Sequence, residues 1–277
     1  MKLRPVVNWN IVGGCNYRCS YCVQKHTEGV GGPDDAALER GLVTLTALPG
    51  TWEFKISGGE PFLLKRLPAV AARLVGAGHR VSLLTNLSAP LPVIERFIDA
   101  TGDGLRTFSC SLHLEETTVE EFLVKVRAVK EKLLAHPKSS FVVNHVVQPG
   151  QIGAAAILRQ RFENNGIKFY PQLMRVNGLP ADYSFVDRWK LKRAFADLTG
   201  PGGMNRGYSH TGKPCNAGFR YFIIHPKGDA YGCYPGKRHN QGYLGNIYER
   251  SLKLNDGPLP CAYAVCPCTV PQNRGIV

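Results

Sequence analysis

Two kinds of hydrophobic segment alternate along the first two thirds of the chain. Short apolar runs typical of buried strands cover residues 5–12, 52–57, 79–85, 105–113, 140–147 and 167–174. Between them, apolar residues recur at helical spacing over residues 35–48, 63–76, 91–100, 119–135 and 152–164. Such alternation predicts a parallel sheet with helices outside it. Because no point of strand-order reversal is evident, we expect an α/β fold built as a partial (β/α)6 barrel.

The pattern changes after residue 177. One helix is expected over residues 182–198, followed by a glycine-rich connector and then short strands and turns. Residues 219–225 and 230–234 read as the two arms of a hairpin. The chain therefore divides into a barrel (1–176), a helical connector (177–212) and a small cysteine-rich domain (213–277).

Three cysteines follow the first expected strand. Cys15, Cys19 and Cys22 have the spacing Cys-x3-Cys-x2-Cys, at the strand end where α/β folds place their chemistry. Three thiolates can hold a [4Fe–4S] cluster and leave one iron free for a ligand. A zinc site with His26 as fourth ligand is the alternative. Other strand ends should lie at the same edge: Gly58-Gly59-Glu60, Thr85-Asn86 and Ser111-Leu112-His113.

A second group of cysteines occupies the C-terminal part: Cys215, Cys233, Cys261, Cys266 and Cys268. This part has little apolar pattern, and small domains of that kind are often stabilised by a metal centre. Four thiolates would complete a second iron–sulfur cluster or a zinc site, leaving one thiol spare. The paired Cys-x2-Cys knuckles of a zinc ribbon are absent. Cys110 alternates with Ser109 and Ser111, so it should face the other side of its strand as a buried, inert thiol.

Composition and charge limit the expected location of the protein and the kinds of partner that it binds. The 277 residues are 44% hydrophobic, which suffices for a full core, and no apolar run approaches the ~20 residues of a membrane span. Nine cysteines without an export signal favour reduced thiols and a cytoplasmic location. The net charge of +13 is spread along the chain, which favours an anionic over a basic partner. No nucleic-acid motif is present, so a nucleic-acid partner is not expected.

The cysteine loop resembles that of the radical S-adenosylmethionine (SAM) enzymes. The resemblance rests on the Cys15, Cys19 and Cys22 spacing with Tyr21 before the last cysteine, on Gly58-Gly59-Glu60-Pro61, and on the six strand–helix units. It covers roughly residues 5–175. The C-terminal part resembles twitch, a shortened relative of the SPASM domain. Its marks are the terminal cysteines, the Gly228-x4-Cys233 step and Leu244-Gly245-Asn246-Ile247. It has fewer cysteines than a full SPASM domain, so it should hold at most one auxiliary [4Fe–4S] cluster.

The resemblance implies a cofactor and its binding residues. Cys15, Cys19 and Cys22 would hold the cluster that reductively cleaves SAM to a 5′-deoxyadenosyl radical, which abstracts hydrogen from a substrate C–H bond. An electron donor such as flavodoxin or ferredoxin would be needed. The implied SAM contacts are Tyr21 at the adenine, Gly58, Gly59 and Glu60 at the amino group, and Thr85 and Ser111 at the ribose or methionine portion.

Roles for the remaining candidates stay open at this point. Cys215 and Cys233 would bind the auxiliary cluster together with two of Cys261, Cys266 and Cys268. The third thiol, Cys261 for example, could be a bystander, a substrate contact or a hydrogen donor. His113 and Glu115 are candidates for a general base or for loop residues. Four further residues could line a substrate pocket or be structural: Tyr208, His210, Arg220 and Tyr221.

These inferences predict a radical SAM oxidoreductase or epimerase. The expected reaction is oxidation (dehydrogenation) or epimerisation of a small polar biosynthetic intermediate, such as an aminocyclitol or amino sugar. No peptide-recognition domain precedes the first strand, which favours a small molecule. The alternatives are a maturase acting on a ribosomally synthesised peptide, a glycyl-radical activating enzyme and, more remotely, a zinc-stabilised nucleic-acid-binding protein.

Overall fold

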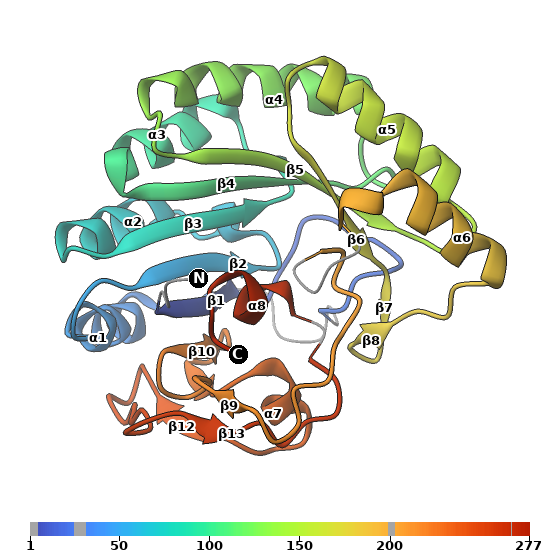
Figure 1. Ribbon diagram of the computed structural model, residues 1–277. Helices are drawn as coiled ribbons and strands as arrows, with labels where there is room; N and C mark the ends of the chain where they lie inside the picture. The colour runs from blue at the N-terminus through green and yellow to red at the C-terminus, as the bar shows by residue number, and fades with distance from the viewer. Residues whose placement is uncertain (1–4, 25–31, 199–202, 267) are drawn as a thin grey trace.

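The predicted α/β architecture with a parallel sheet is confirmed by the computed structural model in Figure 1, which describes residues 5–24, 32–198, 203–266 and 268–277. Six parallel strands form the centre of the sheet: β1 (Val6–Val12), β2 (Glu53–Gly58), β3 (Arg80–Thr85), β4 (Leu105–Leu112), β5 (Ser140–Val147) and β6 (Phe169–Leu173). The intervening helices are α1 (Asp35–Thr46), α2 (Leu67–Gly76), α3 (Leu91–Thr101), α4 (Val119–Lys132) and α5 (Ile152–Asn164). These helices cover one side of the sheet (Figure 1).

The two faces of the sheet differ in chemistry. Outward residues such as Trp9, Phe54 and Phe108 are fully buried against the helices and form the main core. The opposite side carries polar residues at the alternate positions of the same strands. The strand pairing aligns Asn8 with Lys55, and Lys55 with Ser82, in one row across this side. Period-2 alternation thus separates the core from a polar surface.

Two expected helices differ from the structure. The segment 63–76 is interrupted: a 3-10 turn (Pro61–Leu63) precedes α2, which has a proline near its start. The single helix expected over 182–198 is wrong, because α6 spans only Phe185–Ala194 and a separate 3-10 turn (Ala196–Leu198) follows. Ser184 starts α6 by accepting a hydrogen bond from the amide of Asp187. This cap was not recognised in the sequence.

The C-terminal part joins the same sheet. β10 (Tyr221–Ile224) pairs in parallel with β1, and β11 (Asp229–Tyr231) and β12 (Tyr243–Asn246) extend the sheet in antiparallel fashion. The order among the described residues is β12-β11-β10-β1-β2-β3-β4-β5-β6. The predicted hairpin is confirmed as β10–β11. Two short ladders lie outside this sheet, β7 (Arg175–Val176) with β8 (Leu179–Pro180), and β9 (Pro214–Cys215) with β13 (Leu259–Pro260).

A last helix returns the chain to the polar side of the sheet. α8 (Thr269–Asn273) follows the terminal cysteines, while α7 (Tyr234–Arg238) follows Cys233. Arg274, just past α8, donates two hydrogen bonds of 2.9 and 3.0 Å to the carboxylate of Glu53 on β2. Glu53 is only 7% exposed. This ion pair therefore fastens the end of the described chain to the centre of the sheet.

No helix in the described part of the chain is both long and apolar enough to span a membrane.

The Arg274–Glu53 pair generates a pH-dependent prediction. Its hydrogen bonds lower the pKa of Glu53 against the opposing effect of burial. Arg274→Gln leaves a buried carboxylate without its cation, so we expect a loss on the order of 2–4 kcal/mol in the free energy of unfolding at neutral pH. The wild-type advantage is present above the unfolded carboxyl pKa and disappears as pH falls through the folded one. The difference between the two proteins should therefore shrink in acid.

Anaerobic urea unfolding of both proteins between about pH 3 and pH 8 measures this difference, since the range then includes the ordinary glutamate pKa of about 4.3. Lys138→Gln is the matched control, because it removes an ion pair to the exposed Asp103. Equal stability of Arg274→Gln and Lys138→Gln at pH 8 would show that the buried pair does not fasten the C-terminal part.

Candidate active site

The first cysteine loop leaves the C-terminal end of β1. Cys19 is buried, Cys15 is half-buried and Cys22 is exposed. The amide of Cys22 donates to the carbonyl of Cys19 at 3.1 Å, which curls the loop. The side-chain amide of Asn86, just past β3, approaches the Cys15 sulfur at 3.7 Å and the Asn16 side chain at 3.1 Å. Asn86 was expected only as a strand-end residue, and its contact identifies it as a support for the loop.

The backbone of Gly58 and Gly59 is in close contact with the start of this loop. The Gly59 amide donates to the Val12 carbonyl and the Glu60 amide to the Gly14 carbonyl, both at 2.9 Å. A Cβ at Gly59 would lie 1.7 Å from the Gly14 oxygen, and one at Gly58 would lie 2.3 Å from the Val12 oxygen. The resemblance implied that these glycines contact the SAM amino group. The close approach seen here is to the cysteine loop itself.

Glu60 connects this contact to the next strand. Its carboxylate is 1% exposed and accepts hydrogen bonds from the Thr85 hydroxyl at 2.8 Å, the Asn86 amide at 2.7 Å and the Phe62 amide at 3.1 Å. Burial raises the pKa of Glu60, and these bonds oppose the rise. Since the three donors are neutral, a cation bound nearby would be attracted to this carboxylate.

The turn after β4 holds the other side of the cysteine loop. Glu115 accepts from the amide and the hydroxyl of Ser20, each at 2.6 Å. Glu116 accepts from the amide of Arg18 at 2.5 Å. The bonds from Ser20 lower the pKa of Glu115, so this carboxyl stays ionised. Both glutamates thus bind the backbone between Cys15 and Cys22. Glu116 was not predicted, although its position beside Glu115 was a signal.

His113 lies between two tyrosines of the loop. Its Nδ1 is 2.9 Å from the Tyr21 hydroxyl, and its ring stacks on Tyr21 with centroids 5.9 Å apart. Tyr17 meets the same ring edge-on at 6.1 Å. Burial and the neighbouring His145 lower the pKa of His113 to about 4, so it is neutral at physiological pH. His113 is therefore a ring-stacking partner of the loop.

Polar side chains on the inner side of the sheet lead away from the cysteine loop. We call this surface the polar face; it consists of Asn8, Asn10, Lys55, Ser57, Ser109, Ser111 and Asn144. Ser57 donates to Asn10 at 2.9 Å, and Asn144 donates to Ser109 at 2.5 Å. Cys110, on the opposite side of β4, is fully buried in the core as predicted. Hydroxyl, amide and ammonium groups thus line the side of the sheet opposite α1–α5.

The second cysteine group surrounds a cavity of about 260 Å³. Four thiols line it: Cys215, Cys233, Cys261 and Cys266. His210 and Tyr221, two of the four suggested pocket residues, also line it. Burial and the neighbouring thiols raise the pKa of Cys233 to about 11 and that of Cys266 to about 12. The Cys233 and Cys266 thiols therefore resist ionisation until a metal compensates their charge.

The other two suggested pocket residues have structural contacts. Tyr208 pairs with Cys266 through the backbone in an isolated bridge. The Arg220 guanidinium lies over the Phe219 ring, 4.7 Å from its centroid.

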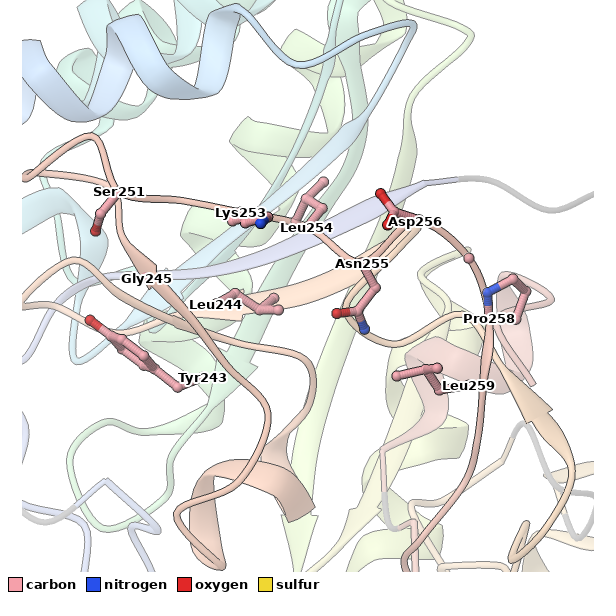
Figure 2. A pocket seen from close by; sticks show the side chains of 11 residues that line it. Tyr243, Leu244, Gly245, Ser251, Lys253, Leu254, Asn255, Asp256, Pro258 and Leu259 are labelled. Atoms are coloured by element: carbon pink, nitrogen blue, oxygen red, sulfur yellow. The ribbon is translucent and has the colours of Figure 1, made fainter.

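A larger hollow of about 660 Å³ lies on the C-terminal part and is shown in Figure 2. It is lined only by residues 243–259. Lys253 and Asp256 are its charged side chains, and it has no cysteine or histidine in its lining. Its wall includes Leu244 and Asn255, which also line the thiol cavity. Because no thiol or imidazole lines this hollow, the thiol cavity is the better candidate for a metal or redox site.

The suggested SAM contacts lie in different environments. Tyr21, Gly58, Gly59 and Glu60 all adjoin the cysteine loop. Thr85 is 2% exposed, and its hydroxyl donates to Glu60 and accepts from the Leu87 amide. Ser111 is half-buried on the polar face. Their assignment to the cofactor stays a prediction.

The alternative zinc ligand His26 lies outside the described residues. Within the described ranges, no three His, Cys, Asp or Glu side chains are arranged to hold a single metal ion. The donor chemistry of the first loop, three thiols with an amide donor directed at Cys15, fits an iron–sulfur cluster.

Residues 9–133 match the family model described as the Radical SAM superfamily. The matched segment contains the end of β1, the cysteine loop, Gly58–Glu60 and the His113–Glu116 turn. The match supports a radical SAM domain over this segment.

Two curated relatives share part of the chain. A probable GTP 3′,8-cyclase of Pyrobaculum aerophilum is 38% identical over 89 residues, which is 31% of this chain and 26% of the relative. An Fe-coproporphyrin III synthase of Methanosarcina barkeri is 32% identical over 85 residues, 30% of this chain and 21% of the relative. The similarity thus spans about a quarter of these relatives.

Solved structures resemble the fold over most of the chain. Streptococcus suis SuiB bound to the precursor peptide SuiA has a TM-score of 0.63 at 13% identity, covering 92% of this chain and 66% of SuiB. BtrN in complex with AdoMet and 2-DOIA has a TM-score of 0.52 at 15% identity, covering 90% of this chain and 80% of BtrN. At these identities the similarity concerns the fold alone.

The glutamates after β4 generate a prediction about cluster retention. In the double variant Glu115→Gln, Glu116→Gln the amides of Ser20 and Arg18 lose charged acceptors, and hydrogen bonds to neutral acceptors are weaker. We expect the iron bound by Cys15, Cys19 and Cys22 to be lost to a chelator about threefold to tenfold faster, since both glutamates are partly exposed.

Absorbance of a chelator–iron complex, followed anaerobically, measures the rate. Glu120→Gln is the control, because Glu120 pairs with Arg161 and not with the loop. Equal rates in all three proteins would show that the glutamates do not stabilise the cysteine loop.

Proposed function

We propose that this protein is a radical SAM enzyme that abstracts hydrogen from a small polar intermediate, such as an aminocyclitol or amino sugar, leading to its oxidation or epimerisation. The observation that carries the proposal is the polar face beside the cysteine loop. A sheet surface lined by amide, hydroxyl and ammonium groups suits a substrate rich in hydrogen-bonding groups.

Charge on the polar side supports a polar and partly anionic substrate. Glu53 is occupied by Arg274 and Ser82, and its nearer oxygen is 3.9 Å from the Lys55 ammonium. Burial lowers the pKa of Lys55, and Glu53 opposes this effect. Two cations thus share one carboxylate. The surplus positive charge favours a substrate that carries an acidic or strongly electronegative group.

The residues at the first loop would serve a bound cluster and SAM. Cys15, Cys19 and Cys22 would hold a [4Fe–4S] cluster, which supplies the electron that cleaves SAM and so gives the 5′-deoxyadenosyl radical. Asn86 supports Cys15, Glu115 and Glu116 fix the backbone, and Tyr21 and His113 form a stacked surface. Glu60 provides the negative charge that suits the SAM amino group. This chain thereby binds, orients and shields the reacting groups.

An auxiliary cluster in the C-terminal part completes the proposal. The thiol cavity presents the donors that an iron–sulfur cluster requires. The Gly236 amide donates to the Cys233 sulfur at 3.3 Å, as suits a thiolate ligand. Such a cluster could accept the second electron of a substrate oxidation. A twitch-type domain is therefore the interpretation that we favour for residues 213–277.

Metal analysis and product analysis test the proposal together. Anaerobically reconstituted protein should contain about eight irons and eight sulfides per chain, and it should form 5′-deoxyadenosine slowly with SAM and a reductant. The triple variant Cys15→Ser, Cys19→Ser, Cys22→Ser should keep about four irons and form no 5′-deoxyadenosine. Zinc without iron in the wild type, or no SAM cleavage, would refute the proposal.

A substrate screen in deuterated water separates the two reactions. Incorporation of one solvent deuterium at carbon indicates epimerisation through an exchangeable hydrogen donor. A product two hydrogens lighter, without deuterium at carbon, indicates oxidation. Turnover of a peptide and not of aminocyclitols or amino sugars would favour the maturase alternative.

A further inference from the structure

Five thiols lie in the C-terminal part, but only four line its cavity. Building on the auxiliary cluster proposed above, we propose that Cys215, Cys233, Cys261 and Cys266 are its ligands and that Cys268 is a free thiol on the substrate side, beside Tyr221 and Asn8.

Backbone contacts bring the four cavity thiols together. The β9–β13 ladder pairs Cys215 with Leu259, two residues before Cys261. The Cys261 amide donates to the Lys213 carbonyl at 2.9 Å. Cys266 and Tyr208 exchange two backbone hydrogen bonds, which fixes Cys266 against the connector. Cys233 caps the start of α7, where its sulfur accepts a hydrogen bond from the Gly236 amide. Each of these thiols is therefore positioned by a separate backbone anchor at the cavity wall.

Cys268 is positioned differently. It directly precedes α8, the helix that lies on the polar side of the sheet. Val270 in the first turn of α8 packs against the cluster of Val6, Tyr221 and Ile223. The Cys268 sulfur is 3.9 Å from the Tyr221 hydroxyl. Cys268 is absent from the cavity lining. Its amide hydrogen-bonds the Cys266 sulfur, while its own sulfur lies beside the Tyr221 hydroxyl.

An unpaired acceptor lies at the end of this contact chain. Asn8 donates its side-chain amide to the Tyr221 hydroxyl at 3.1 Å. The Asn8 side-chain oxygen is buried without a hydrogen-bond partner, in a residue only 7% exposed. An unsatisfied buried acceptor is costly unless a ligand supplies the donor. A substrate hydroxyl or amino group would satisfy it, and would lie on the same side of the sheet as the Cys268 thiol.

Iron content tests the ligand assignment without any turnover. Each tail cysteine is replaced by serine in the Cys15→Ser, Cys19→Ser, Cys22→Ser background, which isolates the auxiliary cluster. We expect Cys268→Ser to keep about four irons and the background absorption spectrum, and Cys215→Ser, Cys233→Ser, Cys261→Ser and Cys266→Ser to lose most of the iron. Cys266→Ser and Cys268→Ser form the matched pair, since they are two residues apart.

Thiol labelling gives an independent readout in the wild-type holoprotein. Iodoacetamide followed by peptide mass spectrometry should modify Cys268 and leave the four cavity thiols protected by iron. Cys110, which is fully buried, should stay unlabelled as an internal control.

The outcomes distinguish the two proposals. Iron loss in Cys268→Ser with retention in Cys261→Ser or Cys266→Ser would overturn the assignment and leave the auxiliary cluster intact. A background protein without iron would overturn the auxiliary cluster and the assignment with it. Protection of Cys268 in the holoprotein, alongside labelling of another tail cysteine, would also contradict the assignment.

Discussion

The contact between Gly59 and Gly14 is the constraint on which the candidate active site depends. The end of β2 lies so close to the start of the cysteine loop that a single added carbon would be 1.7 Å from a carbonyl oxygen. Two backbone hydrogen bonds hold the segments at this distance. Because glycine alone fits, the loop cannot shift toward β2. The rigid sheet therefore fixes the position of the loop's cysteines. Glu60 connects this contact to β3, because its carboxylate accepts hydrogen bonds from Thr85 and Asn86.

The cysteine loop is thus supported from three strand ends. β2 contributes the glycines and Glu60, β3 contributes Asn86, and the turn after β4 contributes His113, Glu115 and Glu116. The loop carries little apolar core of its own, so these polar contacts set its shape. Such an arrangement places flexible, chemically reactive residues on a rigid scaffold. The same strands present the polar face, so the proposed site for radical generation and the proposed substrate surface share one framework.

The sequence was sufficient for the fold class and for the residues at strand ends, because strand–helix periodicity and short motifs are local features. The β5 and α5 bounds were predicted to the residue. Long-range contacts were not predictable in this way. The parallel pairing of β10 with β1 joins residues more than 200 positions apart. No local spacing of residues in the sequence predicts such a pairing. The helix over 182–198 failed because the cap at Ser184 and the break after Ala194 outweigh the charged, helix-favouring composition. Cys268 differs from Cys266 only through tertiary contacts, so sequence spacing could not separate them.

The parallel β10–β1 pairing also affects how this chain can be divided. β1 is an interior strand because β10 occupies one of its edges and β2 the other. A shortened protein ending before β10 would present the amides and carbonyls of β1 as an open edge, with the apolar residues Val6, Trp9 and Ile11 beside it. Open apolar edges recruit strands from other molecules. The N-terminal part of the chain therefore tends to self-associate once it is separated from residues 213–277, and in the intact chain β10 covers this edge.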